Sequence, residues 1–276
     1  PVLLFVILMI LLYIPPVQNL LRREVTAYAS KATGMQIQVE RIDLRFPLNL
    51  LVRGVEVIQQ PDTLLSLESL NVRVQAWPLV KGKVEVDEVT LSQVAFNSAN
   101  LIEGMKIKGV LGRFFLQSHG VDLSNELAVI NQTELSDTHV QMLMNDTTTT
   151  PKDTTASAPV NWKVDLHKLK LKNVSFSMQL PADSMRMAAH IGEAFINDAQ
   201  ADLKNQFYEL KQFLLSGSSA NYDTGAAKPG EGFDASHIAV RDIRIGLDSL
   251  LYKGLDMNAV IREFSMNERS GSVSYT

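Results

Sequence analysis

One spacing of apolar residues recurs along this chain and constrains its fold more than any other feature of the sequence. It reads apolar, any, apolar, any, any, apolar, any, apolar. The copies are Ile37/Val39/Ile42/Leu44, Leu50/Val52/Val55/Val57, Leu65/Leu67/Leu70/Val72, Val84/Val86/Val89/Leu91, Val164/Leu166/Leu169/Leu171 and Ile238/Val240/Ile243/Ile245. Strand-forming residues alternate with polar ones in these stretches, and turn residues such as Pro47, Gly54 and Pro78 separate them. The spacing therefore predicts a mainly β protein.

Two of these copies belong to a longer internal repeat. Residues 83–96 align without gaps to residues 163–176, and the apolar positions of the two segments all match. Because side chains of a flat strand alternate between its faces, each step of two intervening residues would turn the next apolar residues to the opposite face. A β-bulge at each step would keep them on one face and bend the strand. We predict an elongated, curved, repeating sheet, open like a gutter, with a concave apolar face. A sandwich in which a second sheet covers the apolar face is the alternative.

The N-terminal stretch differs from the rest of the chain. Residues 1–14 contain no charged side chain and would span about 21 Å as a helix, less than the bilayer core of about 30 Å. Because the chain also begins with proline, we expect the C-terminal half of a transmembrane anchor helix, with further residues upstream; a buried core helix is the alternative. The predicted anchor residues are Leu3, Leu4, Phe5, Val6, Ile7, Leu8, Ile10, Leu11, Leu12 and Ile14. A short amphipathic helix is predicted to follow over 15–34 and to end at Gly34.

Polar stretches divide the remaining chain. Residues 145–159 contain no large apolar residue, so we predict a flexible linker over 145–160. It would separate a first β segment (35–144) from a second (161–276) that we expect to continue beyond the chain end. Residues 219–236 are predicted to form a second loop. Over 190–215 the apolar period favours a helix, although Ala194/Ile196/Ala199/Ala201 fits the strand spacing.

The sequence contains no recognisable catalytic or metal-binding constellation. It has no cysteine, which excludes disulfides and thiolate ligands, and its five histidines do not have the spacing of a known metal motif. No nucleophile elbow, phosphate-binding loop or dinucleotide fingerprint is present. The net charge of −4 argues against nucleic-acid binding. We therefore predict a protein that is not an enzyme and uses no catalytic residue, metal or cofactor.

Several motifs resemble a known family. They are Ile14-Pro15-Pro16-Val17-Gln18, Ala32-Thr33-Gly34-Met35-Gln36-Ile37, Phe46-Pro47-Leu48-Asn49-Leu50, Arg53-Gly54-Val55-Glu56-Val57, Asp62-Thr63-Leu64-Leu65 and Val80-Lys81-Gly82-Lys83. Together with the repeated strand, they resemble the N-terminal region of TamB proteins, of the Bacteroidota type. TamB is the translocation and assembly module subunit of the AsmA-like superfamily.

This resemblance implies a single-pass inner-membrane protein with most of its mass in the periplasm of a Gram-negative bacterium. A repeating β-groove would conduct phospholipids between inner and outer membranes and so contribute to outer-membrane biogenesis. It further implies an outer-membrane barrel partner of the BamA/TamA type, contacted by regions beyond this chain. The family analogy favours strands over a helix at 190–215.

The predicted lipid-binding surface follows from the repeated spacing. It comprises Ile37, Val39, Ile42, Leu44, Val84, Val86, Val89, Leu91, Val94, Phe96, Val164, Leu166, Leu169, Leu171, Val174, Phe176, Ile238, Val240, Ile243 and Ile245. Phospholipid acyl chains would lie on it while head groups stay in water. In the copy that begins at Ile238, Asp248 stands at the position that Val94 has in the repeat of residues 83–96. We therefore expect the groove to end, turn or shift register there. Alternative functions are a scaffold or chaperone for outer-membrane β-barrel assembly, and a passive spacer between the membranes.

Overall fold

The computed structural model describes residues 15–45, 48–75, 85–122, 125–144, 161–225, 234–268 and 271–275. Within these ranges the chain forms one long helix, a 3-10 turn at Pro181–Asp183 and twelve strands. The elements are α2 (Pro15–Thr33), β1 (Gln36–Arg45), β2 (Asn49–Gln59), β3 (Asp62–Val74), β4 (Val86–Asn97), β5 (Met105–Asp122), β6 (Leu127–Met144), β7 (Lys163–Leu180), β8 (Met185–Asp202), β9 (Phe207–Asp223), β10 (His237–Lys253), β11 (Asp256–Glu268) and β12 (Gly271–Tyr275).

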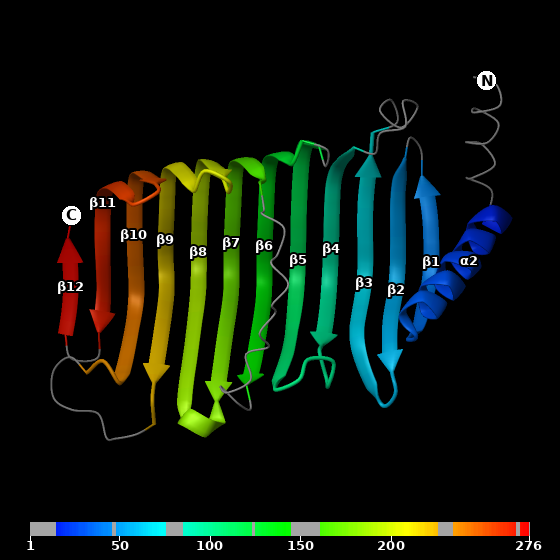
Figure 1. Cartoon of the computed structure of the whole chain (residues 1–276), viewed down its shortest axis with the longest axis horizontal. Coiled ribbons are helices and arrows are strands. Elements are labelled where there is room, and N and C mark those ends of the chain that lie inside the picture. Colours follow the sequence, from blue (N-terminus) through cyan, green and yellow to red (C-terminus); the bar gives the residue numbers. More distant parts are fainter. Residues whose placement is uncertain are drawn as a thin grey trace.

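All twelve strands belong to one sheet, in the order in which they occur along the chain (Figure 1). Every neighbouring pair is antiparallel except β6 and β7, which are parallel. The first and last strands do not pair with each other, so the sheet is open. The mainly β prediction is therefore confirmed, and the two β segments predicted on either side of 145–160 are halves of a single sheet.

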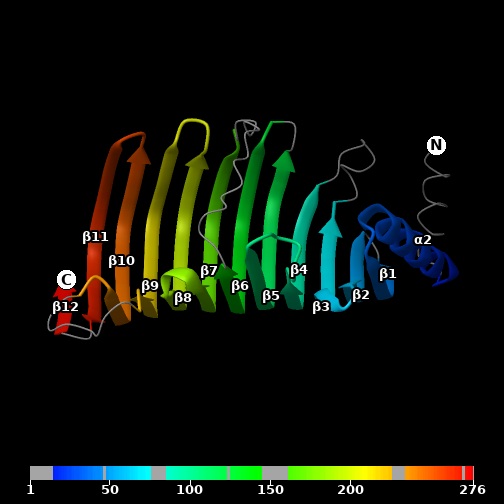
Figure 2. The same ribbon diagram turned by 60° about the horizontal axis from the view of Figure 1, so that its bottom comes forward.

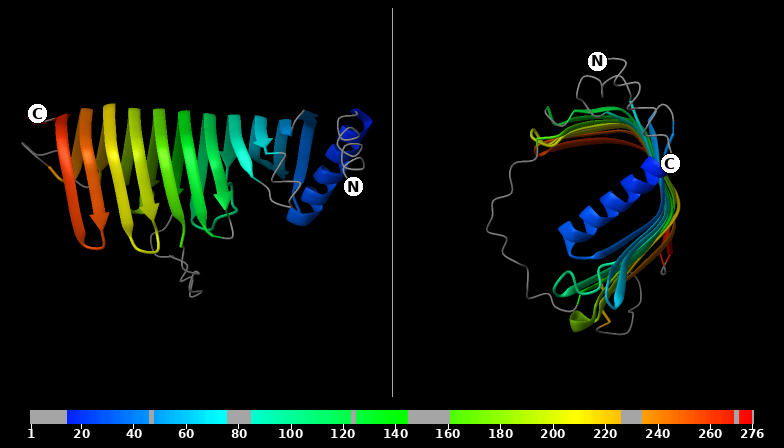
Figure 3. Two further views of the ribbon diagram at one scale, coloured as in Figure 1. Left: turned by 90° about the horizontal axis from the view of Figure 1, so that it is seen from above. Right: turned by 90° about the vertical axis from the view of Figure 1, so that its right-hand side faces the viewer.

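The sheet is one layer thick and curves into a trough. Seen along its length it has the outline of a C, and α2 lies across its N-terminal end (Figure 3). Figure 2 shows α2 beside β1, at the opposite end of the sheet from β12. Among the described residues no large side chain is fully buried, which agrees with a sheet that has no second layer packed on it. The described residues thus do not form the alternative sandwich.

The curvature arises at a line of kinks that crosses the strands. At this level the ladder pairing is interrupted in successive strands, at Glu40, Gly54, Glu68, Gln93, Gly112, Asp137, Asn173, Gly192 and Gly217. Gly54, Gln93, Asp137, Asn173 and Gly217 adopt positive φ there. Most of these residues are Gly, Asn or Asp, which tolerate left-handed backbone better than other residues.

These kinks lie at the steps of two intervening residues, where we predicted bulges. Most of them are not bulges, because no strand has an extra residue relative to its neighbour there. Each strand has its own kink at the same level, so neighbours pass through it without losing register. An extra residue on one strand occurs elsewhere, for example opposite the Arg73–Val74 step of β3, where β4 advances from Glu88 to Val86. Coordinated kinks bend the whole sheet, whereas an isolated bulge bends only one strand against its neighbour.

The structure extends the internal repeat from one strand to three. β5 and β8 begin at Met105 and Met185, 80 positions apart, and both have 18 residues. β6 and β9 begin at Leu127 and Phe207, again 80 positions apart. The positive-φ pairs Gln93/Asn173, Glu126/Gln206 and Asp137/Gly217 have the same offset. The units β4–β5–β6 and β7–β8–β9 are therefore two copies of one three-strand module.

The structure decides two predictions about local structure. Residues 190–215 form parts of β8 and β9, as the family analogy favours, and not the helix that periodicity alone favours, because Ile191, Ala194 and Ile196 follow the strand spacing and pair with neighbouring strands. The loop predicted from residue 219 begins later, since β9 continues to Asp223. The small residues of 216–221 pair with β8 and β10 although their composition resembles that of a loop.

The predicted anchor (1–14), the linker (145–160) and Val84 lie outside the described residues. Within the described ranges, no helix combines the length and apolar character that a bilayer crossing requires. The helix predicted over 15–34 corresponds to α2. It ends as its sequence suggests: Gly34 has φ +70°, and its N–H donates to the Ser30 carbonyl at 2.9 Å.

Candidate functional site: an apolar track along the sheet

An unbroken row of apolar residues runs across the whole sheet. Its members are cross-strand partners, one from each strand in turn. They are Ile42, Val52, Leu70, Leu91, Phe114, Leu135, Leu171, Ala194, Leu215, Ile245, Phe264 and Tyr275. At about 4.8 Å per strand spacing, the row is roughly 50 Å long. We call it the central row.

Parallel rows lie on either side of the central row on the same face. One passes through Leu44, Leu50, Val72, Val89, Leu116, Thr133, Leu169, Ile196, Phe213 and Leu247. The other, beyond the kinks, passes through Val39, Val55, Leu67, Val94, Leu111, Thr138 and Val174, and further on through Ser218 and Ile243. Together with the central row these make up the apolar track.

The structure brings the predicted lipid-binding residues that it describes onto this one face. Ile37, Phe96, Phe176 and Val240 lie in a fourth row beyond Val39, Val94 and Val174. Val86 pairs with Val74, and Val164 and Leu166 pair with Ala201 and Ala199. Ile238 pairs with Tyr222. The rest of the predicted set lies in the rows already named.

Asp248 lies off this face. Leu247 occupies the row instead, and the pairing of β10 with β11 shifts register on both sides of it, between Gly246 and Leu247 and between Leu247 and Ser249. The Asp248 carboxylate pairs with the Arg262 guanidinium at 3.2 Å, and both side chains are about half exposed. The expected register shift is therefore found here against β11, and the Asp248 charge lies off the apolar track.

Sequence reasoning missed the contributions of β5, β6, β8 and β9 to the track. The same spacing is present there, but small or hydroxyl residues fill some positions: Gly109/Leu111/Phe114/Leu116, Thr133/Leu135/Thr138/Val140, Ala189/Ile191/Ala194/Ile196 and Phe213/Leu215/Ser218/Ala220. A search that allowed Gly, Ala, Ser and Thr at apolar positions would have found them. Gly109 is small for a reason, because the ring of its partner Phe96 occupies the space that a Cβ would need.

Two hydroxyl residues fit the track because their polar groups are bonded within their own strands. Thr138 and Ser218 are each about 95% buried or more. The Thr138 hydroxyl donates to the Ser136 carbonyl at 3.1 Å, and the Ser218 hydroxyl donates to the Ser216 carbonyl at 3.1 Å. Both bonds span the kink, where ladder pairing is interrupted. Each side chain therefore presents mainly carbon to the track.

The opposite face has a different composition at the same level. The row one residue away from the central row passes through Asp43, Leu51, Asn71, Thr90, Phe115, Glu134, Lys170, Phe195, Leu214, Gly246 and Glu263. Polar or charged members interrupt this row at several places, and only Phe195 and Leu214 are large apolar neighbours, so the row offers no continuous apolar path. Ion pairs such as Arg73–Glu88 at 2.9 Å lie on this face.

Two members of the apolar track are nearly buried although the sheet is a single layer. Leu67 and Ala194 are only 7% and 6% exposed, so neighbouring side chains on the same face must cover them. Side chains converge on the concave face of a curved sheet and diverge on its convex face, so this cover agrees with the predicted concave position of the track.

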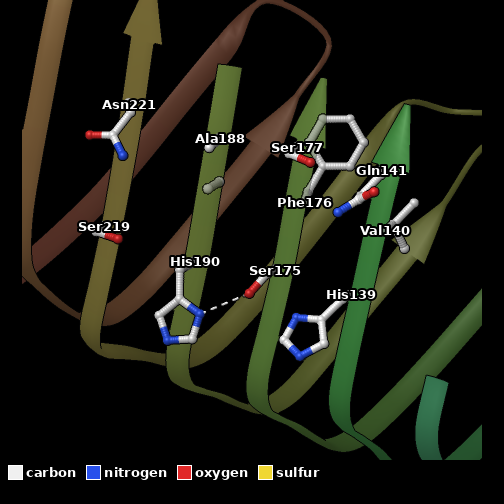
Figure 4. A pocket seen from close by; sticks show the side chains of 11 residues that line it. His139, Val140, Gln141, Ser175, Phe176, Ser177, Ala188, His190, Ser219 and Asn221 are labelled. Carbon is white, nitrogen blue, oxygen red and sulfur yellow. Dashed lines mark hydrogen bonds between the residues drawn. The ribbon is translucent and has the colours of Figure 1, made fainter. Parts of the chain in front are cut away.

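A shallow polar hollow lies on the other face, across β6 to β9 (Figure 4). The Ser175 hydroxyl and His190 Nδ1 are 3.0 Å apart, and His139 and Ser219 also line the hollow. Of the described residues that line it, none is a carboxylate that could orient the imidazole for nucleophilic catalysis. The described residues also contain no group of three or more His, Asp or Glu side chains placed to hold a metal ion.

Helix α2 covers the edge of the sheet at the N-terminal end of the track. The Gln18 amide donates to the Leu44 carbonyl at 3.0 Å, and the Arg22 guanidinium donates to the Glu40 carbonyl at 2.9 Å. In the other direction, the Ile37 N–H donates to the Ser30 hydroxyl at 3.1 Å. These bonds satisfy backbone groups of β1 that would otherwise be open for pairing with another strand.

No protein-family model matches this chain, and no curated protein is significantly similar to it in sequence.

Proposed function

We propose that this protein is a conduit along which phospholipid acyl chains move, anchored in the inner membrane of a Gram-negative bacterium and extending into the periplasm. The observation that carries the proposal is the central row, which is apolar in every strand from Ile42 to Tyr275. The resemblance of the sequence to TamB proteins, and the apolar stretch 1–14 as a transmembrane anchor, support the same assignment.

The energetics of such a track suit transport better than storage. Covering acyl carbon releases about 0.8 kcal/mol per CH₂, so several rows of aliphatic side chains can hold a lipid without polar contacts. The three-strand module repeats, so successive positions along the track offer similar surfaces and similar free energies. A lipid can then slide without falling into one deep site, while its head group stays in water at the open side of the trough.

Charges within the track test this proposal. We compare two double variants. The track variant carries both Val89→Asp and Leu169→Asp, and the control carries both Thr90→Asp and Lys168→Asp. The control residues are sequence neighbours on the opposite face, so both chains gain acidic groups at the same strand positions. Native mass spectrometry of the purified chain should show phospholipid bound to the wild type and the control, and little on the track variant.

Circular dichroism checks that the sheet persists in both variants, and Val89→Ser with Leu169→Ser is the milder replacement should the acidic one unfold. Equal phospholipid occupancy in the folded track variant and the control would refute the conduit.

A further inference from the structure

Six of the ten methionines gather at one rim of the sheet, on the four neighbouring strands β5 to β8. This rim is the lower one in Figure 1, where the 3-10 turn joins β7 to β8. We call these residues the methionine cluster, and they are Met105, Met142, Met144, Met178, Met185 and Met187.

Three members of the cluster form a row across the sheet. Met142, Met178 and Met187 are consecutive cross-strand partners in β6, β7 and β8. Phe176 lies two residues from Met178 and belongs to the fourth row of the track face, so the three methionines lie on that face as well. Neighbouring strands are about 4.8 Å apart, so Met178 has another methionine within one strand spacing on either side.

Two further members lie on the same face, one step nearer the rim. Met144 is two residues from Met142 in β6, and Met185 is two residues from Met187 in β8. The strands on either side of Met178 therefore each carry a Met-x-Met pair. Because a methionine side chain has three rotatable bonds, sulfur atoms from these strands can converge on one point without movement of the backbone.

The surroundings of the row offer no ligand other than sulfur. Ile107 and Tyr222 continue the row on either side. Within two residues along β6, β7 and β8, the same-face neighbours of the three methionines are all apolar or methionine. His139 and His190 line the hollow on the other face. Solvent reaches the row, since Met187 is 38% exposed.

The chemistry of thioether sulfur identifies the ligand class. Carboxylates and carbonyls suit Mg²⁺ and Ca²⁺, and imidazole suits Zn²⁺, whereas the soft thioether selects Cu(I). A thioether also takes up no proton in mildly acidic water, so its metal affinity does not fall there as that of an imidazole does.

We propose that the methionine cluster is a binding site for Cu(I), with Met142, Met178 and Met187 as its ligands. The inference does not depend on the proposed function. The carbon atoms of the same side chains extend the apolar surface of the track, and that surface persists when sulfur is replaced by carbon.

Replacement of sulfur by carbon tests the site with little change in packing, because leucine and methionine are similar in volume. The cluster variant carries Met142→Leu, Met178→Leu and Met187→Leu. The matched control carries Met35→Leu, Met257→Leu and Met266→Leu, which removes three thioethers outside the cluster. Circular dichroism checks that both chains keep the sheet, and Met178→Leu alone is the milder variant.

Ag⁺ is a suitable probe, because it is a soft monovalent cation like Cu(I) and needs no reductant. Each 276-residue chain is titrated with Ag⁺ in chloride-free buffer and analysed by native mass spectrometry. A second titration uses Cu(I) kept reduced by ascorbate, with bicinchoninate as the competing chelator. We expect one ion on the wild type and on the control, and an affinity lower by about tenfold or more in the cluster variant.

Equal affinities in the two triple variants would mean that the ions bind adventitiously to methionines anywhere in the chain, and would overturn the inference. Loss of Ag⁺ from every chain between about pH 7 and about pH 5 would assign the ions to histidines, and would also overturn it. Phospholipid occupancy should be equal in all three chains. A failure of the conduit therefore leaves the contrast in Ag⁺ affinity intact, and a failure of this inference leaves lipid occupancy intact.

Discussion

The modules β4–β5–β6 and β7–β8–β9 have second strands of equal length and the same kink positions, yet they continue differently. The first module is followed by a parallel strand, β7, and the second by an antiparallel strand, β10. In both cases the apolar residues enter the same rows. The reason is the spacing itself, which reads identically in both chain directions. Strands of either direction therefore align their apolar positions, and the track is independent of how the strands are connected.

The largest expected effect tests whether the two modules act in series. Leu91 and Leu171 are equivalent members of the central row, and each should be required if lipid passes along a single path. In the full-length protein we expect Leu91→Asp or Leu171→Asp alone to stop most transfer of labelled phospholipid between inner- and outer-membrane fractions. The double variant should show no further loss. If each single variant removes only part of the transfer and the losses add, the modules are separate binding sites.

The next effect concerns two equivalent glycines at the kinks. A Cβ on Gly192 would lie 2.5 Å from the Gly217 carbonyl oxygen, and one on Gly112 would lie 2.7 Å from the Asp137 Cβ. Because backbone atoms limit relaxation at both sites, alanine at either should lower the free energy of unfolding by about 1–3 kcal/mol. Urea denaturation followed by circular dichroism measures this. Gly246 has no positive φ, and the atom nearest to its Cβ position lies 3.4 Å away on the Arg262 side chain, so Gly246→Ala serves as a control with a smaller expected effect. A much lower cost at one kink would show that the modules are not equivalent.

A smaller effect should distinguish the two modules. Gln93 and Asn173 occupy the same kink position with φ +49° and +53°. Glycine relieves left-handed strain, so Gln93→Gly should stabilise the sheet by about 0.5–1 kcal/mol. Asn173 tolerates this backbone better, and its amide donates to the Asp137 carboxylate at 2.7 Å across the parallel pair. We therefore expect Asn173→Gly to be neutral or destabilising. The same denaturation experiment decides, and an equal gain at both positions would contradict the role of the Asn173–Asp137 bond.

The smallest effect is a difference in acid response. In the second module the hydrogen bond from His167, together with the nearby Lys211 charge, lowers the pKa of the Asp198 carboxyl. The equivalents in the first module are Asp87 and Ser118, which form no such pair. A carboxyl group whose pKa is lower in the native state than in the unfolded state stabilises the fold at pH values above its unfolded-state pKa. This stabilisation is lost as the pH falls through the native-state pKa, below about pH 4.

Carboxyl NMR titration should show that His167→Ala raises the pKa of Asp198. Asp202 is the control, because the Asn205 side chain is the main cause of its lowered pKa and is unaffected by this change. An unchanged Asp198 titration in the variant would exclude His167 as the cause.

Much of the track could be predicted from the sequence because large aliphatic residues mark it in β1, β3, β4 and β7. The prediction failed where the requirement was for a small or bonded side chain. Ala194 in β8 is nearly buried because its neighbours on the same face cover it. Ser218 in β9 tolerates burial because its hydroxyl donates to a carbonyl of its own strand. Composition made that part of β9 resemble a loop. Periodicity favoured a helix over 190–215 because Phe195, Leu203 and Leu210 also fit a helical period, and short segments satisfy both periods.

The sequence by itself determined which residues share a face. The spacing of its apolar residues is palindromic, and the residues at the intervening steps are polar or tolerate a left-handed backbone. This pattern specifies kinked strands with one apolar side. Only the tertiary structure decided how those strands combine. The parallel pairing of β6 with β7 and the alignment of kinks across successive strands both depend on contacts between residues far apart in the chain. A local pattern specifies the direction of side chains, but the register between distant strands is specified only when their backbones pair.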